Sequence, residues 1–173
     1  MKPDAQKTEP APKRILFVCT GNICRSTMAE YILRARLGNN PGWKVASAGV
    51  AAAHGEPASE EAVVVCRELG LDLRPHGSQP VTRELMETSR WVVVMTETHR
   101  EILARQYPEF HARIRLLKSF GFSGAFGDIP DPIGGSAEVY RTVRDMIESA
   151  ISDLVLFLRE QEGRANTGRE HTT

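Results

Sequence analysis

The sequence predicts an α/β fold in three layers, with helices covering both faces of a four-stranded parallel sheet. Short apolar segments alternate with longer segments in which apolar residues recur at helical spacing, and this alternation is typical of βαβ units with right-handed crossovers. The segment Trp91–Met95 is apolar throughout and rich in β-branched residues, as expected of a central strand covered on both faces. The chain has 173 residues, enough for one domain with a single core.

Three regions follow one another along the chain. Residues 1–12 place prolines among polar residues and predict a flexible tail. Residues 13–160 contain the apolar and periodic segments and are expected to form the folded domain. Residues 161–173 have lost helical periodicity, so we expect a disordered tail there.

The first strand is expected at Arg14–Val18 and the first helix at about Ser26–Leu37. Glycine, asparagine and proline end this helix from Gly38 onward, and the second strand is expected at Trp43–Ala48. The remaining predicted elements, in chain order, are a helix from Pro57 or Ala58 to Leu69, a short helix from Thr82 to Glu87, the strand Trp91–Met95, a helix with a capping box of Thr98 and Glu101 that ends near Tyr107, a strand at Ile114–Leu117, a long loop over 118–135, and a helix from Ser136 whose apolar face reaches Leu158.

Composition argues against several classes of function. Lys plus Arg and Asp plus Glu both number 22, so no global field points to nucleic acid or to a membrane surface. No segment approaches the roughly 20 apolar residues of a membrane span, and residues 1–12 have no apolar run, so we expect neither a signal peptide nor an anchor there. Three cysteines fit a reducing compartment, and no Cys or His spacing suggests a metal. We expect a cytoplasmic, monomeric protein without cofactor or metal.

The loop between the first strand and the first helix carries the chemistry. It reads Cys-Thr-Gly-Asn-Ile-Cys-Arg-Ser over residues 19–26, and Gly21 and Asn22 tolerate a left-handed backbone. A helix N-terminus attracts anions through its unpaired N–H groups, and the same field favours a thiolate at Cys19. Arg25 adds a planar fork for two phosphate oxygens. The sequence therefore predicts a phosphate-binding loop after the first strand, with a cysteinyl-phosphate intermediate. A structural cysteine in an ordinary βα turn is the alternative.

This run resembles the catalytic loop of the low-molecular-weight protein phosphatase family, and the resemblance covers roughly residues 13–160. Members act on phosphotyrosine or, in one bacterial branch, on phosphoarginine, so the implied partner is a phosphorylated protein. By this resemblance Ser26 hydrogen-bonds the thiolate, His76 hydrogen-bonds Asn22, and Ser47 lies behind the loop. The residues expected to contact the substrate are Thr20, Gly21, Asn22, Ile23, Cys24, Ser26 and Ile133.

A general acid is expected from the long loop. Asp131 stands between two prolines, which stiffen its backbone, and long loops in compact domains are usually functional. Both loops leave the sheet at the carboxyl ends of strands, where ligands bind in such folds. An Asp-Pro is otherwise most often a turn or an Asx cap. The resemblance assigns the acid to Asp131, with Asp128 as a less favoured alternative.

The residues that bear on the substrate class point to two different branches of the family. Ile133 replaces the aromatic wall of the tyrosine phosphatases, and the run Asp-Pro-x-Gly-Gly-Ser followed by Val139-Tyr140 is similar to the arginine-phosphatase branch. Ile23, however, stands where that branch carries threonine. We expect phosphotyrosine, with phosphoarginine as the alternative. A phosphate-binding module is a further alternative, as is an arsenate reductase, which Cys66 on an apolar helix face disfavours.

Overall fold

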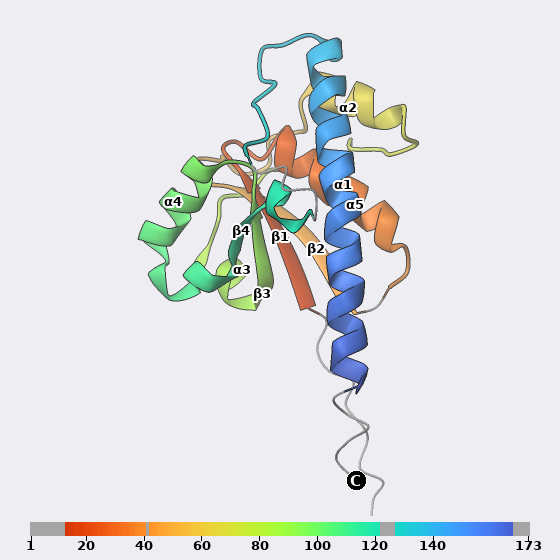
Figure 1. The fold of residues 1–173 in the computed structure, drawn as a ribbon. Coiled ribbons are helices and arrows are strands. Elements are labelled where there is room, and N and C mark those ends of the chain that lie inside the picture. Colours follow the sequence, from red (N-terminus) through yellow and green to blue (C-terminus); the bar gives the residue numbers. More distant parts are fainter. Residues whose placement is uncertain (1–12, 41, 122–126, 168–173) are drawn as a thin grey trace, which may run out of the picture.

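A computed structural model describes residues 13–40, 42–121 and 127–167. Its centre is a parallel sheet of four strands in the order β2-β1-β3-β4, which confirms the predicted fold class (Figure 1). The strands are β1 (Lys13–Cys19), β2 (Trp43–Gly49), β3 (Ser89–Val94) and β4 (Ile114–Leu116). The helices are α1 (Arg25–Leu37), α2 (Glu60–Arg67), α3 (Arg83–Thr88), α4 (Glu97–Gln106) and α5 (Ala137–Thr167), with short 3-10 helices η1 (Pro108–Arg113) and η2 (Leu117–Phe120).

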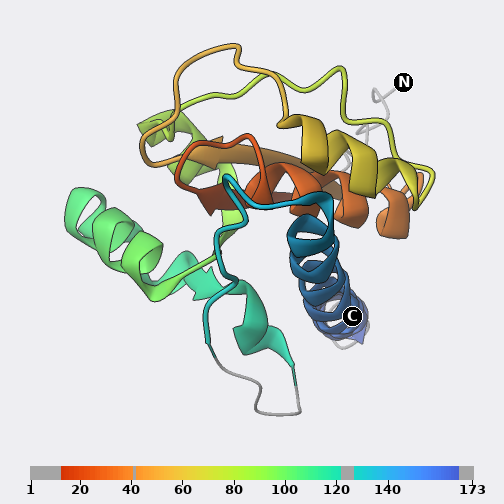
Figure 2. The same ribbon diagram turned by 90° about the horizontal axis from the view of Figure 1, so that it is seen from above.

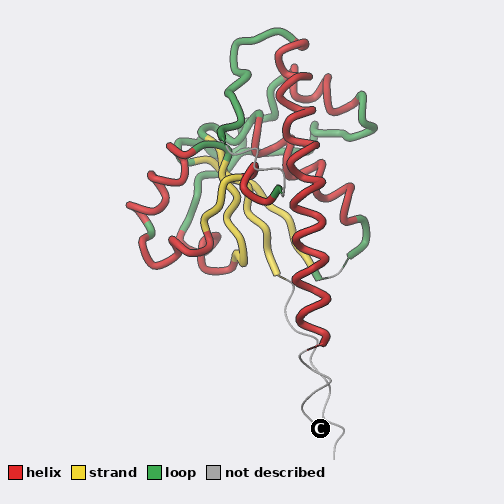
Figure 3. The backbone as a smooth tube through the Cα atoms, in the orientation of Figure 1, coloured by secondary structure: helices red, strands yellow, loops and turns green. Residues whose placement is uncertain are grey.

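Helices cover both faces of the sheet (Figure 3). Alternate residues of β1 point to opposite faces, as they must in a strand. Ile15 and Phe17 pack in the larger apolar cluster with side chains of α1, α2 and α5. Leu16 and Val18 pack in the smaller cluster with Met86 of α3 and side chains of α4. All four of these β1 side chains are fully buried, so the strand that leads to the cysteine loop is held from both sides.

Two helices begin elsewhere than predicted. The second helix starts at Glu60 and not at Pro57 or Ala58, because the side chain of Ser59 accepts a hydrogen bond from the N–H of Ala62. The fourth helix has Thr96 as its N-cap, whose side chain accepts from the N–H of His99, so the predicted capping box at Thr98 is wrong. In both cases the hydroxyl that caps the helix decides its first residue.

The sequence predicts a disordered tail from Gln161 onward. In the structure α5 continues past this residue and ends at Thr167, so the prediction is wrong for residues 161–167. Glu162 anchors this extension, because its carboxylate accepts hydrogen bonds from Trp43 Nε1 at 2.6 Å and from Asn40 Nδ2 at 3.3 Å. The tail predicted at 1–12, part of the long loop (122–126) and residues 168–173 lie outside the described residues. No helix within the described ranges is both long and apolar enough to cross a membrane.

Candidate active site

The β1–α1 loop turns tightly at the carboxyl edge of the sheet. Asn22 has a φ of 57°, in the left-handed region that asparagine tolerates. Gly49 pairs with Cys19 across the β1–β2 ladder, and a Cβ there would lie 2.4 Å from the carbonyl oxygen of Thr20. Only a glycine lets the second strand approach the loop this closely.

Cys19 is 3% exposed at the start of this loop, and its sulfur faces two hydrogen-bond donors. The N–H of Asn22 donates to Sγ at 3.3 Å, and Ser26 Oγ lies 3.0 Å from it. Because Ser26 Oγ accepts from Asn22 Nδ2 at 2.9 Å, its own proton is available to the sulfur. The predicted contact between Ser26 and the cysteine is therefore present, and both donors point at the sulfur.

The side chain of Asn22 is the centre of a buried polar network. Its Nδ2 also donates to Ser47 Oγ at 2.8 Å, and its Oδ1 accepts from the N–H of Gln79 at 2.9 Å. The Ser47 hydroxyl donates in turn to the carboxylate of Glu30, which is 6% exposed. Asn22 and Ser26 are fully buried, so their side chains support the loop from behind, whereas we expected them to contact substrate.

His76 holds the same loop from another side. Its Nε2 lies 2.7 Å from the carbonyl oxygen of Asn22 and 3.2 Å from Thr27 Oγ1. Since a carbonyl only accepts, this nitrogen carries the ring proton. The predicted contact between His76 and Asn22 thus exists, although it reaches the backbone and not the side chain.

Arg25 begins α1 and is 4% exposed. Its Nη1 donates to the carbonyl oxygen of Ile129 at 3.1 Å, and its Nη2 donates to Asp131 Oδ2 at 2.9 Å. Its buried Nε has no hydrogen-bond partner in the described part of the chain. A buried guanidinium N–H without a partner is costly, and an anion in the neighbouring cavity would satisfy it.

A cavity of about 200 Å³ joins the two predicted halves of the site. The segment that leads into α5 passes beside the β1–α1 loop (Figure 2), and Asp131 extends from it towards Arg25. Ile133 is 59% exposed at the rim. The residues that line the cavity are Cys19, Thr20, Gly21, Ile23, Cys24, Arg25, Asp131 and Ile133.

Asp128 does not line this cavity. Its Oδ1 accepts from the N–H of Glu97 at 2.8 Å, so it caps the N-terminus of α4. Of the two carboxylates considered as the acid, only Asp131 faces the cysteine's cavity.

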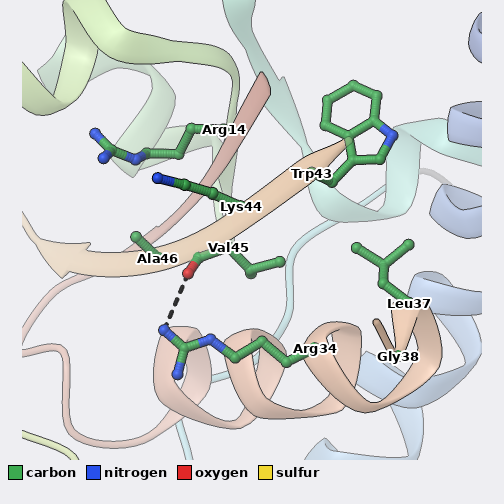
Figure 4. A pocket seen from close by; sticks show the side chains of 8 residues that line it. All are labelled: Arg14, Arg34, Leu37, Gly38, Trp43, Lys44, Val45 and Ala46. Carbon is green, nitrogen blue, oxygen red and sulfur yellow. Dashed lines mark hydrogen bonds between the residues drawn. The ribbon is translucent and has the colours of Figure 1, made fainter. Parts of the chain in front are cut away.

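A larger hollow of about 470 Å³ lies at the amino end of β2, away from Gly49 and the cysteine loop (Figure 4). It gathers the cations Arg14, Arg34 and Lys44, and Arg34 donates to the carbonyl oxygen of Val45 at 3.0 Å. No nucleophile or carboxylate is among the described residues that line it, so it does not compete with the cysteine's cavity as a catalytic centre.

The other two cysteines are held in different surroundings. Cys24 lies 3.2 Å from the Tyr140 hydroxyl and 3.4 Å from Ser59 Oγ, and burial raises the pKa of its thiol. Cys66 of α2 is fully buried in the larger apolar cluster, and burial raises the pKa of its thiol to about 12. Packing of Cys66 in the core agrees with the prediction that disfavoured an arsenate reductase.

The fold and the site together define an α/β protein with a phosphate-binding loop between its first strand and first helix. A model of the low molecular weight phosphotyrosine protein phosphatase family matches residues 14–164. The protein-arginine-phosphatase of Geobacillus stearothermophilus is 42% identical over 151 residues, which cover 87% of this chain and 99% of that relative. The low molecular weight protein-tyrosine-phosphatase of Streptomyces coelicolor is 37% identical over 163 residues, which cover 88% and 98%.

A solved structure agrees with these similarities. The YwlE arginine phosphatase from Geobacillus stearothermophilus matches with a TM-score of 0.81 at 40% identity, covering 94% of this chain and 99% of that one. The chain belongs to the low molecular weight phosphotyrosine protein phosphatase family, and it is a phosphatase.

Several residues of the site carry no signal that sequence reasoning used. Glu30 and Gln79 complete the network around Asn22, and His99 contacts Thr20. The spacing of Ser26 and Glu30, one helical turn apart, is the only local hint that Glu30 faces the loop. Gln79 and His99 come from segments that only the tertiary fold brings to this edge.

Proposed function

We propose that this protein hydrolyses phosphotyrosine in proteins, with Cys19 as nucleophile and Asp131 as general acid. The observation that carries the proposal is the shared cavity, in which a buried cysteine, a buried arginine and the loop aspartate meet. A binding module would need the arginine but would have no use for a cysteine and a carboxylate beside the same anion.

The first step transfers the phosphoryl group to sulfur. The N–H groups of the loop and Nε of Arg25 hold the phosphoryl oxygens, which stabilises the charge of the transition state. The Cys19 thiolate forms an S–P bond while the P–O bond to tyrosine breaks, and Asp131 gives its proton to the departing phenolate oxygen. The products of this step are tyrosine and a cysteinyl phosphate.

The second step regenerates the enzyme. The Asp131 carboxylate takes a proton from water, whose oxygen attacks phosphorus while the S–P bond breaks. The sulfur leaves as a thiolate, which the Ser26 hydroxyl and the Asn22 N–H stabilise. Inorganic phosphate is released, and Asp131 is protonated for the next cycle.

The choice of phosphotyrosine depends on Ile23. Its side chain lines the cavity beside Cys19 and offers an apolar surface, which suits an aromatic ring better than a guanidinium group. An aromatic wall of the kind that Ile133 replaces would add only about 0.5–1.5 kcal/mol of stacking. A residue inside the loop should therefore outweigh one at the exposed rim.

A second candidate is hydrolysis of phosphoarginine. It is supported by the similarity to the protein-arginine-phosphatase of Geobacillus stearothermophilus and by the run Ile133-Gly134-Gly135, which leaves the rim without an aromatic residue. In either case the partner is a phosphorylated protein. We further infer a monomeric cytoplasmic enzyme that needs no metal or other cofactor.

Parallel kinetics on phosphotyrosine and phosphoarginine peptides test the choice. We expect the wild type to have the higher kcat/KM on phosphotyrosine and Ile23→Thr to shift the ratio towards phosphoarginine, because a polar wall discriminates polar groups better. Ile23→Val is the matched control, since valine has nearly the shape of threonine without its hydroxyl. A wild-type preference for phosphoarginine would establish the second candidate instead.

A further inference from the structure

Thr20 follows the nucleophile, lines the catalytic cavity and is exposed, yet its hydroxyl is tied to a buried group. Its Oγ1 lies 2.9 Å from Nε2 of His99, a residue of α4. On its other side, the carbonyl oxygen of Thr20 accepts from the N–H of Ala51 at 3.0 Å. The residue is therefore fixed both by α4 and by the segment that follows β2.

His99 is 4% exposed and both of its ring nitrogens have partners. Nδ1 lies 3.0 Å from Thr96 Oγ1, the same oxygen that accepts the backbone N–H of His99 at the start of α4. The imidazole thus lies between two threonine hydroxyls, one at the helix cap and one in the cavity wall.

The ring is neutral at neutral pH. Burial, and then the charge of Arg25, lower the pKa of His99 to about 4, against the weaker opposing effect of Asp131 and Asp128. A neutral imidazole has one N–H and one acceptor nitrogen, so the two threonine contacts are of opposite kinds.

We propose that His99 is a positioning residue that directs the Thr20 hydroxyl proton towards a phosphoryl oxygen bound in the cavity. Because Thr96 Oγ1 already accepts the backbone N–H of His99, its own proton is available to Nδ1, and the ring N–H is then at Nε2 and donates to Thr20 Oγ1. The Thr20 oxygen then accepts from the histidine, which leaves its own proton for the ligand. This inference rests on the proposed function, which places a phosphoryl group in that cavity.

Vanadate inhibition, with p-nitrophenyl phosphate as the substrate, tests this arrangement. Thr20→Val and His99→Leu should each raise the vanadate inhibition constant and the KM about three- to tenfold, the size of one lost hydrogen bond, and change kcat less. Thr20→Ser, which keeps the hydroxyl, should recover most of the vanadate affinity that Thr20→Val loses. The double variant should have a vanadate inhibition constant no higher than that of either single variant, because both changes remove the hydrogen bond from the Thr20 hydroxyl to the bound oxyanion.

Two cap variants separate positioning from helix stability. Thr96 and Thr82 cap α4 and α3 in the same way, each accepting an N–H three residues on, but only Thr96 contacts the ring of His99. We expect Thr96→Val and Thr82→Val to lower Tm by similar amounts and only Thr96→Val to weaken vanadate binding.

Three results would overturn the inference: unchanged vanadate inhibition in Thr20→Val, additive effects in the double variant, or equal weakening by the two cap variants. If His99→Leu does not fold, Thr20→Val tests the hydroxyl, and the comparison of Thr96→Val with Thr82→Val tests the histidine. These failures differ from a failure of the proposed function, in which wild-type protein itself would not hydrolyse p-nitrophenyl phosphate.

Discussion

Nη2 of Arg25 lies 2.9 Å from Oδ2 of Asp131, so the residue expected to grip phosphate also holds the residue expected to supply the proton. The arginine is 4% exposed and the aspartate 42% exposed, and they are 106 residues apart in the sequence. Nε of the same guanidinium has no partner among the described residues, so it remains for a phosphoryl oxygen while Asp131 stays on Nη2. In the proposed mechanism, one guanidinium therefore places the phosphoryl group beside the general acid.

Arg25→Lys should abolish most activity although it keeps the positive charge. An ammonium group cannot bond the Ile129 carbonyl, Asp131 and a phosphoryl oxygen in one plane. We expect kcat on p-nitrophenyl phosphate to fall about 10²–10³-fold, as for other lost transition-state donors. A variant within a few-fold of wild type would show that charge alone suffices.

Asp131→Asn should lower kcat on phosphotyrosine about 10²–10⁴-fold, the usual range for a lost general acid. The loss should shrink for aryl phosphates with better leaving groups, which need less protonation. Asp128→Asn is the control, because that carboxylate caps α4 outside the cavity and its loss should cost far less. If Asp128→Asn loses more activity than Asp131→Asn, the assignment of the general acid to Asp131 is wrong.

Asn22→Gly should remove the buried side-chain hydrogen bonds of Asn22 without changing the conformation of the backbone. Glycine adopts a φ of 57° without strain, so the variant removes only the side-chain bonds to Ser26, Ser47 and Gln79. Leaving such buried groups unpaired costs about 1–3 kcal/mol each, so urea unfolding should reveal a clear loss of stability, with lower kcat. An unchanged midpoint of unfolding would mean that water replaces the amide fully.

Stability should fall in acid partly because of His99. Its pKa of about 4 in the folded protein lies below the ordinary value of 6.5, so the unfolded chain binds the proton more readily. The stabilisation is complete above pH 6.5 and is lost as the pH falls towards 4. Urea unfolding at about pH 7.5 and about pH 4.5 should show a smaller acid loss in His99→Gln than in wild type. Equal losses would contradict a buried neutral histidine.

Local sequence patterns were sufficient to predict the sheet and the two segments that form the walls of the catalytic cavity. Apolar runs predict four strands that the structure confirms to within a few residues, and the run Cys19–Ser26 between strand and helix marks the cavity. A proline-flanked Asp131 marks the opposite wall. These features are encoded over fewer than ten consecutive residues, where periodicity and turn chemistry act.

The contacts that sequence reasoning missed are those between distant segments. His99 contacts Thr20, 79 positions away in the sequence. Trp43 donates to Glu162, 119 positions away, and this bond explains why α5 continues where the sequence has lost its helical periodicity. Hydrogen bonds of this kind depend on how the elements pack, and no local spacing predicts them.

The covalent intermediate is the central claim, and rapid-quench mass spectrometry tests it most directly. Wild-type enzyme mixed with excess p-nitrophenyl phosphate and quenched within milliseconds should carry one phosphoryl group, on the peptide that contains Cys19. Cys19→Ala should carry none and should not turn over, while still binding vanadate. A wild type that turns over without any phosphoryl adduct on Cys19, or a Cys19→Ala variant that keeps near-normal activity, would contradict the account.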